Sequence, residues 1–315
     1  MTGIGSELQV GKQTAWGTPV TPDTKINMTS ESVAATVEKG DEGNLLPKKT
    51  RDQADIIAIN VDGSISAILR PEFADWLFEC ALGKKLLNGK YVLADPNTAL
   101  PVSTFVISRG GIVKTYPDVT ITRLQLSAVA QDYVRVTFDV TGVNEIAAGD
   151  DGAKTIQNLS FTLPSYRCTS ATLLYGAGGT AESSLSQSLC VEETNISIES
   201  STQDAPATYC DGFYNPRPVI GLRTVGVDFR LQYSTAIDQF RQDYLLDEDA
   251  PTVALKLVFT TKDPDENVEI YMPNISLNTA SGNVDGQGII ESSIAGEALS
   301  VGSAEPITVA VNHAE

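Results

Sequence analysis

Residues 225–233 read VGVDFRLQY, and their pattern indicates the class of fold. Apolar side chains stand at every second position, and a period of two is typical of a strand with one buried and one solvated face. Ser234 follows directly and is a suitable N-cap residue for a helix. One side of the expected helix then carries Ile237, Phe240, Tyr244 and Leu245. The stretch therefore predicts a strand that runs straight into an amphipathic helix.

The same order of strand and helix occurs earlier in the chain. Residues 61–69 end in an alternating pattern, and Pro71 stands where the first turn of a helix tolerates proline. Gly83 follows the expected end of this helix. The apolar residues between them have the spacing of one helix face: Phe73, Trp76, Leu77, Cys80 and Ala81. Both apolar faces are interpreted as core rather than as cofactor sites.

Further alternating runs occupy residues 134–140 and 253–259. They are typical of antiparallel strands with one solvated face. The sequence therefore predicts a mainly β fold with two helices.

Three anchors recur in the same order along the chain. The strand–helix unit is the first, and a Pro-Asp/Asn-apolar-Ser/Thr-apolar pattern is the second, at Pro117–Ile121 and Pro273–Leu277. The third pairs Ile26–Glu31 with Asn195–Glu199. This repetition suggests a tandem duplication, with coincidence among short strands as the alternative.

The length of 315 residues agrees with two modules of about 150 residues each. We expect the first module at residues 1–165 and the second at 166–315, with a flexible linker at about 166–188 that includes Gly176–Gly179. These glycines do not match a dinucleotide-binding fingerprint, because Ala181 occupies the place of its third glycine.

A long irregular stretch precedes the strand before each helix, and stretches of this length are usually functional or disordered. The first carries apolar and basic residues: Leu45, Leu46, Lys48, Lys49 and Arg51. The second carries Phe213, Tyr214 and Arg217. We interpret these eight residues as candidate contacts with a partner; the alternative is that the apolar ones fold onto their own module.

Acidic residues dominate the charge, with 40 Asp and Glu against 22 Lys and Arg and a net charge of −18. Residues 1–165 carry a net charge of −4 and residues 166–315 carry −14. This balance excludes a protein that grips DNA through its phosphates, since that grip needs clustered Lys and Arg. No apolar run is long enough to span a membrane, and residues 1–7 lack the features of a secretory signal.

Histidine and cysteine usage argues against catalysis and metal binding. The single histidine, His313, is the third residue from the C-terminus, which disfavours Ser-His-Asp, Cys-His and histidine–metal sites unless the tail folds back. The four cysteines, Cys80, Cys168, Cys190 and Cys210, lack zinc-site spacing. They are interpreted as buried reduced thiols, with a disulfide among the last three as the alternative. We expect no enzyme, cofactor or metal site.

A family resemblance rests on short motifs near the N-terminus. Gly5–Leu8 is followed by Thr14–Pro19, then by a strand ending at Ser30–Ser32, and later by a helix that opens with Pro71–Ala74. This order resembles the tail tube proteins of long-tailed bacteriophages. The resemblance implies a β-sandwich or half-barrel with one flanking helix and a long loop, here present twice.

The resemblance also implies a structural role in the virion tail, with assembly in the cytoplasm of the host bacterium. Subunits would form rings that stack into a hollow tube, and the long loop would reach the neighbouring ring. A duplicated chain implies three copies per ring with pseudo-sixfold symmetry; six copies are the alternative. Implied partners are the tape measure, tail terminator and tip proteins, and double-stranded DNA that passes without specific binding.

Physical chemistry adds two expectations to this resemblance. A DNA conduit must not bind phosphate, so lumen-facing residues should be predominantly Asp, Glu, Ser, Thr, Asn and Gln. The basic residues Lys48, Lys49 and Arg51 should dock on an acidic surface of the next ring. A surface or secreted β-sandwich that binds glycans or mediates adhesion is the main alternative function, and a carboxylate-based hydrolase is the third.

Overall fold

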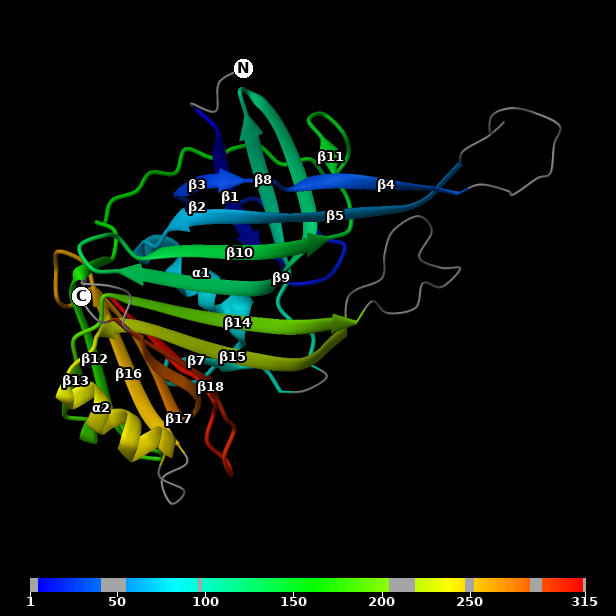
Figure 1. The fold of residues 1–315 in the computed structure, drawn as a ribbon. Coiled ribbons are helices and arrows are strands. Elements are labelled where there is room, and N and C mark those ends of the chain that lie inside the picture. Colours follow the sequence, from blue (N-terminus) through cyan, green and yellow to red (C-terminus); the bar gives the residue numbers. More distant parts are fainter. Residues whose placement is uncertain are drawn as a thin grey trace.

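The computed structural model describes residues 5–40, 55–95, 98–203, 219–246, 252–283 and 291–313. Within them the chain is mainly β, as predicted (Figure 1). Strands of the first half, up to Ser165, are β1 (Glu7–Lys12), β2 (Thr24–Ile26), β3 (Met28–Glu31), β4 (Ala34–Gly40), β5 (Asp55–Ile68), β6 (Gly83–Lys85), β7 (Tyr91–Leu93), β8 (Ser103–Arg109), β9 (Ile112–Val129), β10 (Arg135–Gly142) and β11 (Ile146–Ala147). Strands of the second half are β12 (Arg167–Ala177), β13 (Gln187–Leu189), β14 (Glu193–Gln203), β15 (Val219–Gln232), β16 (Val253–Thr260), β17 (Asn267–Asn283), β18 (Glu291–Ala298) and β19 (Thr308–Asn312). The helices are α1 (Pro71–Leu82) and α2 (Thr235–Arg241), with a 3-10 turn η1 (Glu182–Ser184) and a π-helical turn η2 (Gln242–Leu246).

Both predicted strand–helix units are confirmed. β15 leads into α2, and the hydroxyl of Ser234 accepts a hydrogen bond from the backbone N–H of Ile237 at 3.4 Å. Pro71 opens α1, and Gly83 ends it in the left-handed conformation with φ 89°. Because that conformation is strained for residues with a Cβ, glycine is the residue that fits this end.

Helix α1 fills the core of the first half. The ring of Trp76 lies 5.7 Å from that of Phe105 on β8 and 6.1 Å from that of Phe138 on β10. Its Nε1 donates a hydrogen bond to the Ser103 hydroxyl at 3.0 Å. All residues of the predicted apolar face are buried, and so are Ala74, Phe78 and Leu82. Each buried large side chain contributes about 1.5–3 kcal/mol of hydrophobic stabilisation.

Helix α2 is shorter and packs less deeply. Ile237 and Phe240 are buried, and the Phe240 ring lies 5.1 Å from Tyr175 on β12. Tyr244 and Leu245, on the π-helical turn, are half-buried against the same core. The predicted apolar side of this helix is therefore confirmed, but only its first half is fully buried.

One antiparallel sheet runs through both halves of the chain. Its strands lie in the order β4, β5, β10, β9, β14, β15, β18 and β17. Figure 1 shows β4, β5, β10, β9, β14 and β15 one below another, with β4 and β5 extending beyond the rest. In each half, a second set of strands shares one long strand with this sheet: β2, β1 and β8 with the start of β9, and β13, β12 and β16 with the start of β17.

The strand pairings of the two halves follow the same order. β4–β5, β5–β10, β10–β9, β9–β8, β8–β1 and β1–β2 have counterparts in β14–β15, β15–β18, β18–β17, β17–β16, β16–β12 and β12–β13. Ladder irregularities recur as well. Thr122 in β9 and Asn278 in β17 are each left without a partner in the ladder to the next strand, at a register shift typical of a β-bulge.

Proline inside a central strand needs an interruption of the ladder, because proline has no N–H to donate. Pro117 in β9 and Pro273 in β17 both meet this requirement. The pairing of β8 with β9 shifts register across Pro117, and that of β16 with β17 shifts across Pro273. These prolines mark where each long strand passes from one set of strands to the other.

The segment expected as a flexible linker is instead structured. Residues 167–177 form β12, which pairs with β16, and Gly176 lies opposite Ala254 in that ladder. Gly178 donates a backbone hydrogen bond to Thr252 at 3.0 Å. The glycines have no alternating pattern of apolar side chains that would predict a strand. The strand that pairs with this segment lies about 80 residues further along the chain.

The C-terminal segment folds back onto the first half. β19 pairs with β17 and also with β7, and His313 Nε2 lies 2.6 Å from a carboxylate oxygen of Asp75 on α1. His313 Nδ1 lies 3.5 Å from Glu266, in the β16–β17 turn. The only histidine is therefore placed between two carboxylates, and it ties the C-terminal segment to α1 and to the β16–β17 turn.

Cysteine burial agrees with expectation fully at one position and in part at a second. Cys80 is buried and Cys168 half-buried, and burial raises the pKa of their thiols to about 12 and about 11. Cys190 is an exposed free thiol, contrary to the buried thiol expected, because it lies in the loop between β13 and β14 rather than inside a strand. Cys210 lies outside the described residues.

Candidate assembly surface

Two strands form the free edges of the main sheet. In the described part of the chain, β4 pairs with β5 alone, and the second half of β17 pairs with β18 alone. Backbone N–H and C=O groups along such edges can pair with a strand of another chain. The two edges lie at opposite ends of the sheet order, so the molecule offers one free edge at each end.

The halves of one chain already meet edge to edge. β9 pairs with β14 from Val129 opposite Glu193 to Arg123 opposite Glu199. Arg123 Nε lies 2.9 Å from a carboxylate oxygen of Glu199 across this joint, and both side chains are about half exposed. We call this ladder the internal joint. It is the only link of the main sheet between the first and second halves within the described residues.

One face of the main sheet is polar. It consists of the side chains that alternate with the buried core residues, and we call it the wet face. Its acidic members are Asp62, Asp139, Glu193, Glu199, Asp228, Glu291 and Glu297, and its arginines are Arg123, Arg135 and Arg230. Uncharged members include Ser64, Ser66, Gln125, Ser127, Thr137, Thr141, Asn195, Ser197, Thr224, Gln232, Ser276, Thr279 and Ser293. Carboxylates therefore outnumber arginines on this face.

The arginines of the wet face are all ion-paired. Arg135 lies 3.1 Å from Asp132, and Arg230 lies 3.1 Å from Glu193. Arg123 is held by Glu199, as described above. Each of these three guanidinium groups therefore has a carboxylate partner.

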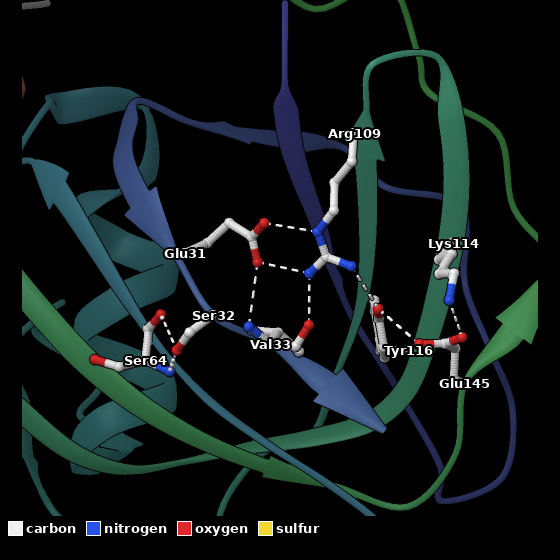
Figure 2. Close-up of polar contacts among 8 residues, drawn as sticks. All are labelled: Glu31, Ser32, Val33, Ser64, Arg109, Lys114, Tyr116 and Glu145. Carbon is white, nitrogen blue, oxygen red and sulfur yellow. Dashed lines mark hydrogen bonds and ion pairs between the residues drawn. The ribbon is translucent and has the colours of Figure 1, made fainter. Parts of the chain in front are cut away.

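A polar network holds the start of the β4 edge in place (Figure 2). Arg109, at the end of β8, donates from Nε and Nη2 to the two carboxylate oxygens of Glu31, both at 2.6 Å. Arg109 also donates to the backbone carbonyl of Val33, whose N–H donates back to Glu31 at 3.1 Å. Two-pronged pairs of this kind fix orientation as well as adding energy. The hydrogen bonds with Arg109 hold the pKa of Glu31 below its usual range.

The network continues onto β9 and β11. Arg109 Nη1 donates to the Tyr116 hydroxyl at 3.0 Å, and that hydroxyl donates to Glu145 at 2.9 Å. Lys114 completes it by pairing with the same Glu145 carboxylate. Burial raises the pKa of Tyr116 to about 12, so the phenol stays neutral and can donate. We call these residues, with Glu31 and Arg109, the edge brace.

The turn between β3 and β4 is fixed from the other side by β5. Ser32 and Ser64 exchange hydrogen bonds through the Ser32 hydroxyl, at 3.0 and 3.3 Å (Figure 2). Val33, which is buried, passes so close to Gly63 that an added Cβ there would lie 2.5 Å from the Val33 Cα. Glycine at position 63 therefore allows the backbone at Val33 to approach β5 closely.

The eight candidate contact residues proposed from the sequence all lie outside the described residues: Leu45, Leu46, Lys48, Lys49, Arg51, Phe213, Tyr214 and Arg217. They remain predictions. The edge brace, in contrast, has no signal in the sequence. Arg109 stands on a strand beside Gly110 and Gly111, but nothing in the spacing links it to Glu31, 78 residues earlier.

The described residues hold no cluster of three or more His, Cys, Asp or Glu that could bind a metal ion. Neither of their helices is long and apolar enough to cross a membrane. The prominent features of this part of the chain are thus a polar sheet face and two sheet edges.

Comparison with known proteins identifies the family. The model of the phage tail tube protein family matches residues 3–298, which is nearly the whole chain. No curated protein matches. The mainly β fold with one long antiparallel sheet agrees with the family match. The chain belongs to the phage tail tube protein family.

Proposed function

We propose that this protein is a structural component of the virion tail that assembles with copies of itself into stacked rings, and that the rings form the tube through which double-stranded DNA is ejected. We further propose that residues 1–165 and 166–315 are two copies of one tail-tube module. The matching order of strand pairings in the two halves supports this view.

The observation that carries the proposal is the internal joint. It shows how the sheet of one half continues into the sheet of the other through β9 and β14. The edges left free are β4, the counterpart of β14, and the end of β17, the counterpart of β9. A chain with complementary edges at opposite ends forms heterologous contacts, which give a ring when the rotation closes. Three chains would supply six modules; a ring of six chains is the alternative.

The wet face supports a role as the lining of the tube. Lysine and arginine side chains that contact DNA phosphates release the bound counterions and so hold the duplex. DNA can therefore slide through a channel only where the walls lack such contacts. On the wet face carboxylates exceed arginines, and those arginines are paired. The proposed orientation therefore gives a lumen that repels DNA.

The remaining parts of the proposal concern other partners. The tape measure, tail terminator and tip proteins would contact the tube, and assembly would take place in the cytoplasm of the bacterial host. Residues such as Leu45, Lys48 and Tyr214 would reach the neighbouring ring. The role is structural rather than enzymatic.

Electron microscopy of the purified protein tests this function. We expect rings or tubes at high concentration, and native mass measurement of a single ring should give three times the chain mass of 33.5 kDa. Six times that mass would overturn the three-copy ring but keep the tube. A monomer at all concentrations that is stabilised by glycans would instead support the adhesion alternative.

A further inference from the structure

The two halves correspond residue by residue along the strands that form the joint. Thr122 and Asn278 are the bulge residues of β9 and β17. Beyond them, Arg123 lies opposite Asp139, and Thr279 lies opposite Ala295. Thr279 is therefore the counterpart of Arg123, and Ala280 is the counterpart of Leu124.

The other side of the joint can be matched in the same way. Val140 on β10 and Gly296 on β18 are the residues paired next to the bulges at Thr122 and Asn278. Val140 pairs with Gly63 on β5, and Gly296 pairs with Val227 on β15, so Gly63 and Val227 are counterparts. Two residues earlier, Val61 pairs with Ala35 and Val225 pairs with Ile198. Ala35 on β4 is thus the counterpart of Ile198 on β14, and Thr36 is the counterpart of Glu199.

We infer that the free edges of neighbouring copies pair in the register of the internal joint. Glu199 lies opposite Arg123 and Ile198 opposite Leu124 within the chain. Between chains, Thr36 of one copy then lies opposite Thr279 of the next, Ala35 opposite Ala280, and Val33 opposite Gly282. The partner is a second copy of this chain, and the inference rests on the proposed ring.

In this register the edge brace adjoins one end of the new joint, because it is bonded to Val33. Val33, Glu31 and Arg109 fix the start of β4 before any partner arrives. A strand that is already held in its bound geometry loses less conformational entropy on pairing. No ion pair is expected at the new joint where the internal joint has Arg123 and Glu199, because both counterparts are threonines.

Disulfide trapping tests the register. Opposite residues in an antiparallel pair have Cα atoms about 4.5–5.5 Å apart, within the range of about 4.4–6.8 Å that a disulfide accepts. The variant is Thr36→Cys with Thr279→Cys, in a Cys190→Ser, Cys210→Ser background. The matched control is Thr36→Cys with Ser281→Cys, which shifts the pair by two residues to the diagonal, about 7–8 Å away.

On mild oxidation of assembled protein, we expect the Thr279 pair to convert monomer into covalent oligomers and the Ser281 pair to stay monomeric. Wild-type rings seen by microscopy, together with trapping only in the control, would overturn the register and leave the proposed function standing. Absence of wild-type rings would overturn the proposed function, and the inter-chain joint with it.

Charge substitutions give a second measurement in case the cysteines impair assembly. Thr36→Glu with Thr279→Glu places like charges opposite each other and should block ring formation. Thr36→Glu with Thr279→Arg recreates the ion pair of the internal joint and should restore it. Equal assembly of the two folded variants would contradict the register.

Discussion

Arg109 and Glu31 form a two-pronged ion pair in which both hydrogen bonds measure 2.6 Å. Only 13% of the Glu31 side chain is exposed, so water screens this pair less than the ion pairs of the wet face, such as Arg123 with Glu199. Through Val33 the pair is joined to the backbone of the edge strand. A contact between two residues 78 positions apart thus sets the place of an edge that we propose to be an assembly surface.

Replacing Arg109 with Gln should destabilise the monomer. It removes the two charge-assisted hydrogen bonds to Glu31 and those to Val33 and Tyr116, and it leaves the Glu31 carboxylate half-buried without its cation. We therefore expect a loss of about 1–2 kcal/mol in the free energy of unfolding. Urea unfolding measures it. Arg135→Gln is the matched control, because its pair with Asp132 is solvent-exposed and should contribute less than about 1 kcal/mol. Equal losses in both variants would contradict a special role for the brace.

Acid should weaken the same contact. The hydrogen bonds from Arg109 lower the pKa of Glu31 in the folded state. A carboxyl whose folded pKa lies below its unfolded value, about 4.3, stabilises fully above that value and loses the contribution as pH falls through the folded pKa. We therefore expect the stability difference between wild type and Glu31→Gln to be largest near pH 6 and to shrink below pH about 4. A difference that is constant down to pH 3 would contradict this assignment.

Gly63→Ala tests how the edge strand lies on the sheet. The new methyl group would meet the Val33 Cα at 2.5 Å, so the β3–β4 turn must move away from β5. We expect a loss of about 1–3 kcal/mol in unfolding free energy, as for other overpacked sites, and a lower yield of rings. Ser66→Ala on the same strand is the control and should assemble normally. Normal ring yield with Gly63→Ala would show that the position of this turn does not matter for assembly.

Local signals explain which parts of the fold could be predicted. Pro71 and Gly83 define the ends of α1 through their own backbone preferences. The alternation in residues 225–233 indicates a strand with one buried face, and this signal does not depend on which strand pairs with it. The β12 strand and the edge brace depend on pairing between distant segments, and their residues carry no periodic pattern that reveals it. His313 shows the same limit, since its place beside Asp75 follows from the pairing of β19 with β7 rather than from its neighbours in sequence.

The wet face makes a prediction about DNA. Asp62→Lys, Asp139→Lys and Glu297→Lys together would replace three negative charges of the proposed lumen with three positive ones, and each new lysine at a phosphate would release counterions. We expect assembled tubes of this variant to retain short DNA duplexes and protect them from nuclease, with retention that falls steeply as salt rises, whereas wild-type tubes retain none. The matched control carries Asp263→Lys, Asp265→Lys and Glu305→Lys, which make the same charge change away from the wet face. Because DNA bound outside a tube stays open to nuclease, equal protection by the two variants would place the wet face elsewhere than in the lumen.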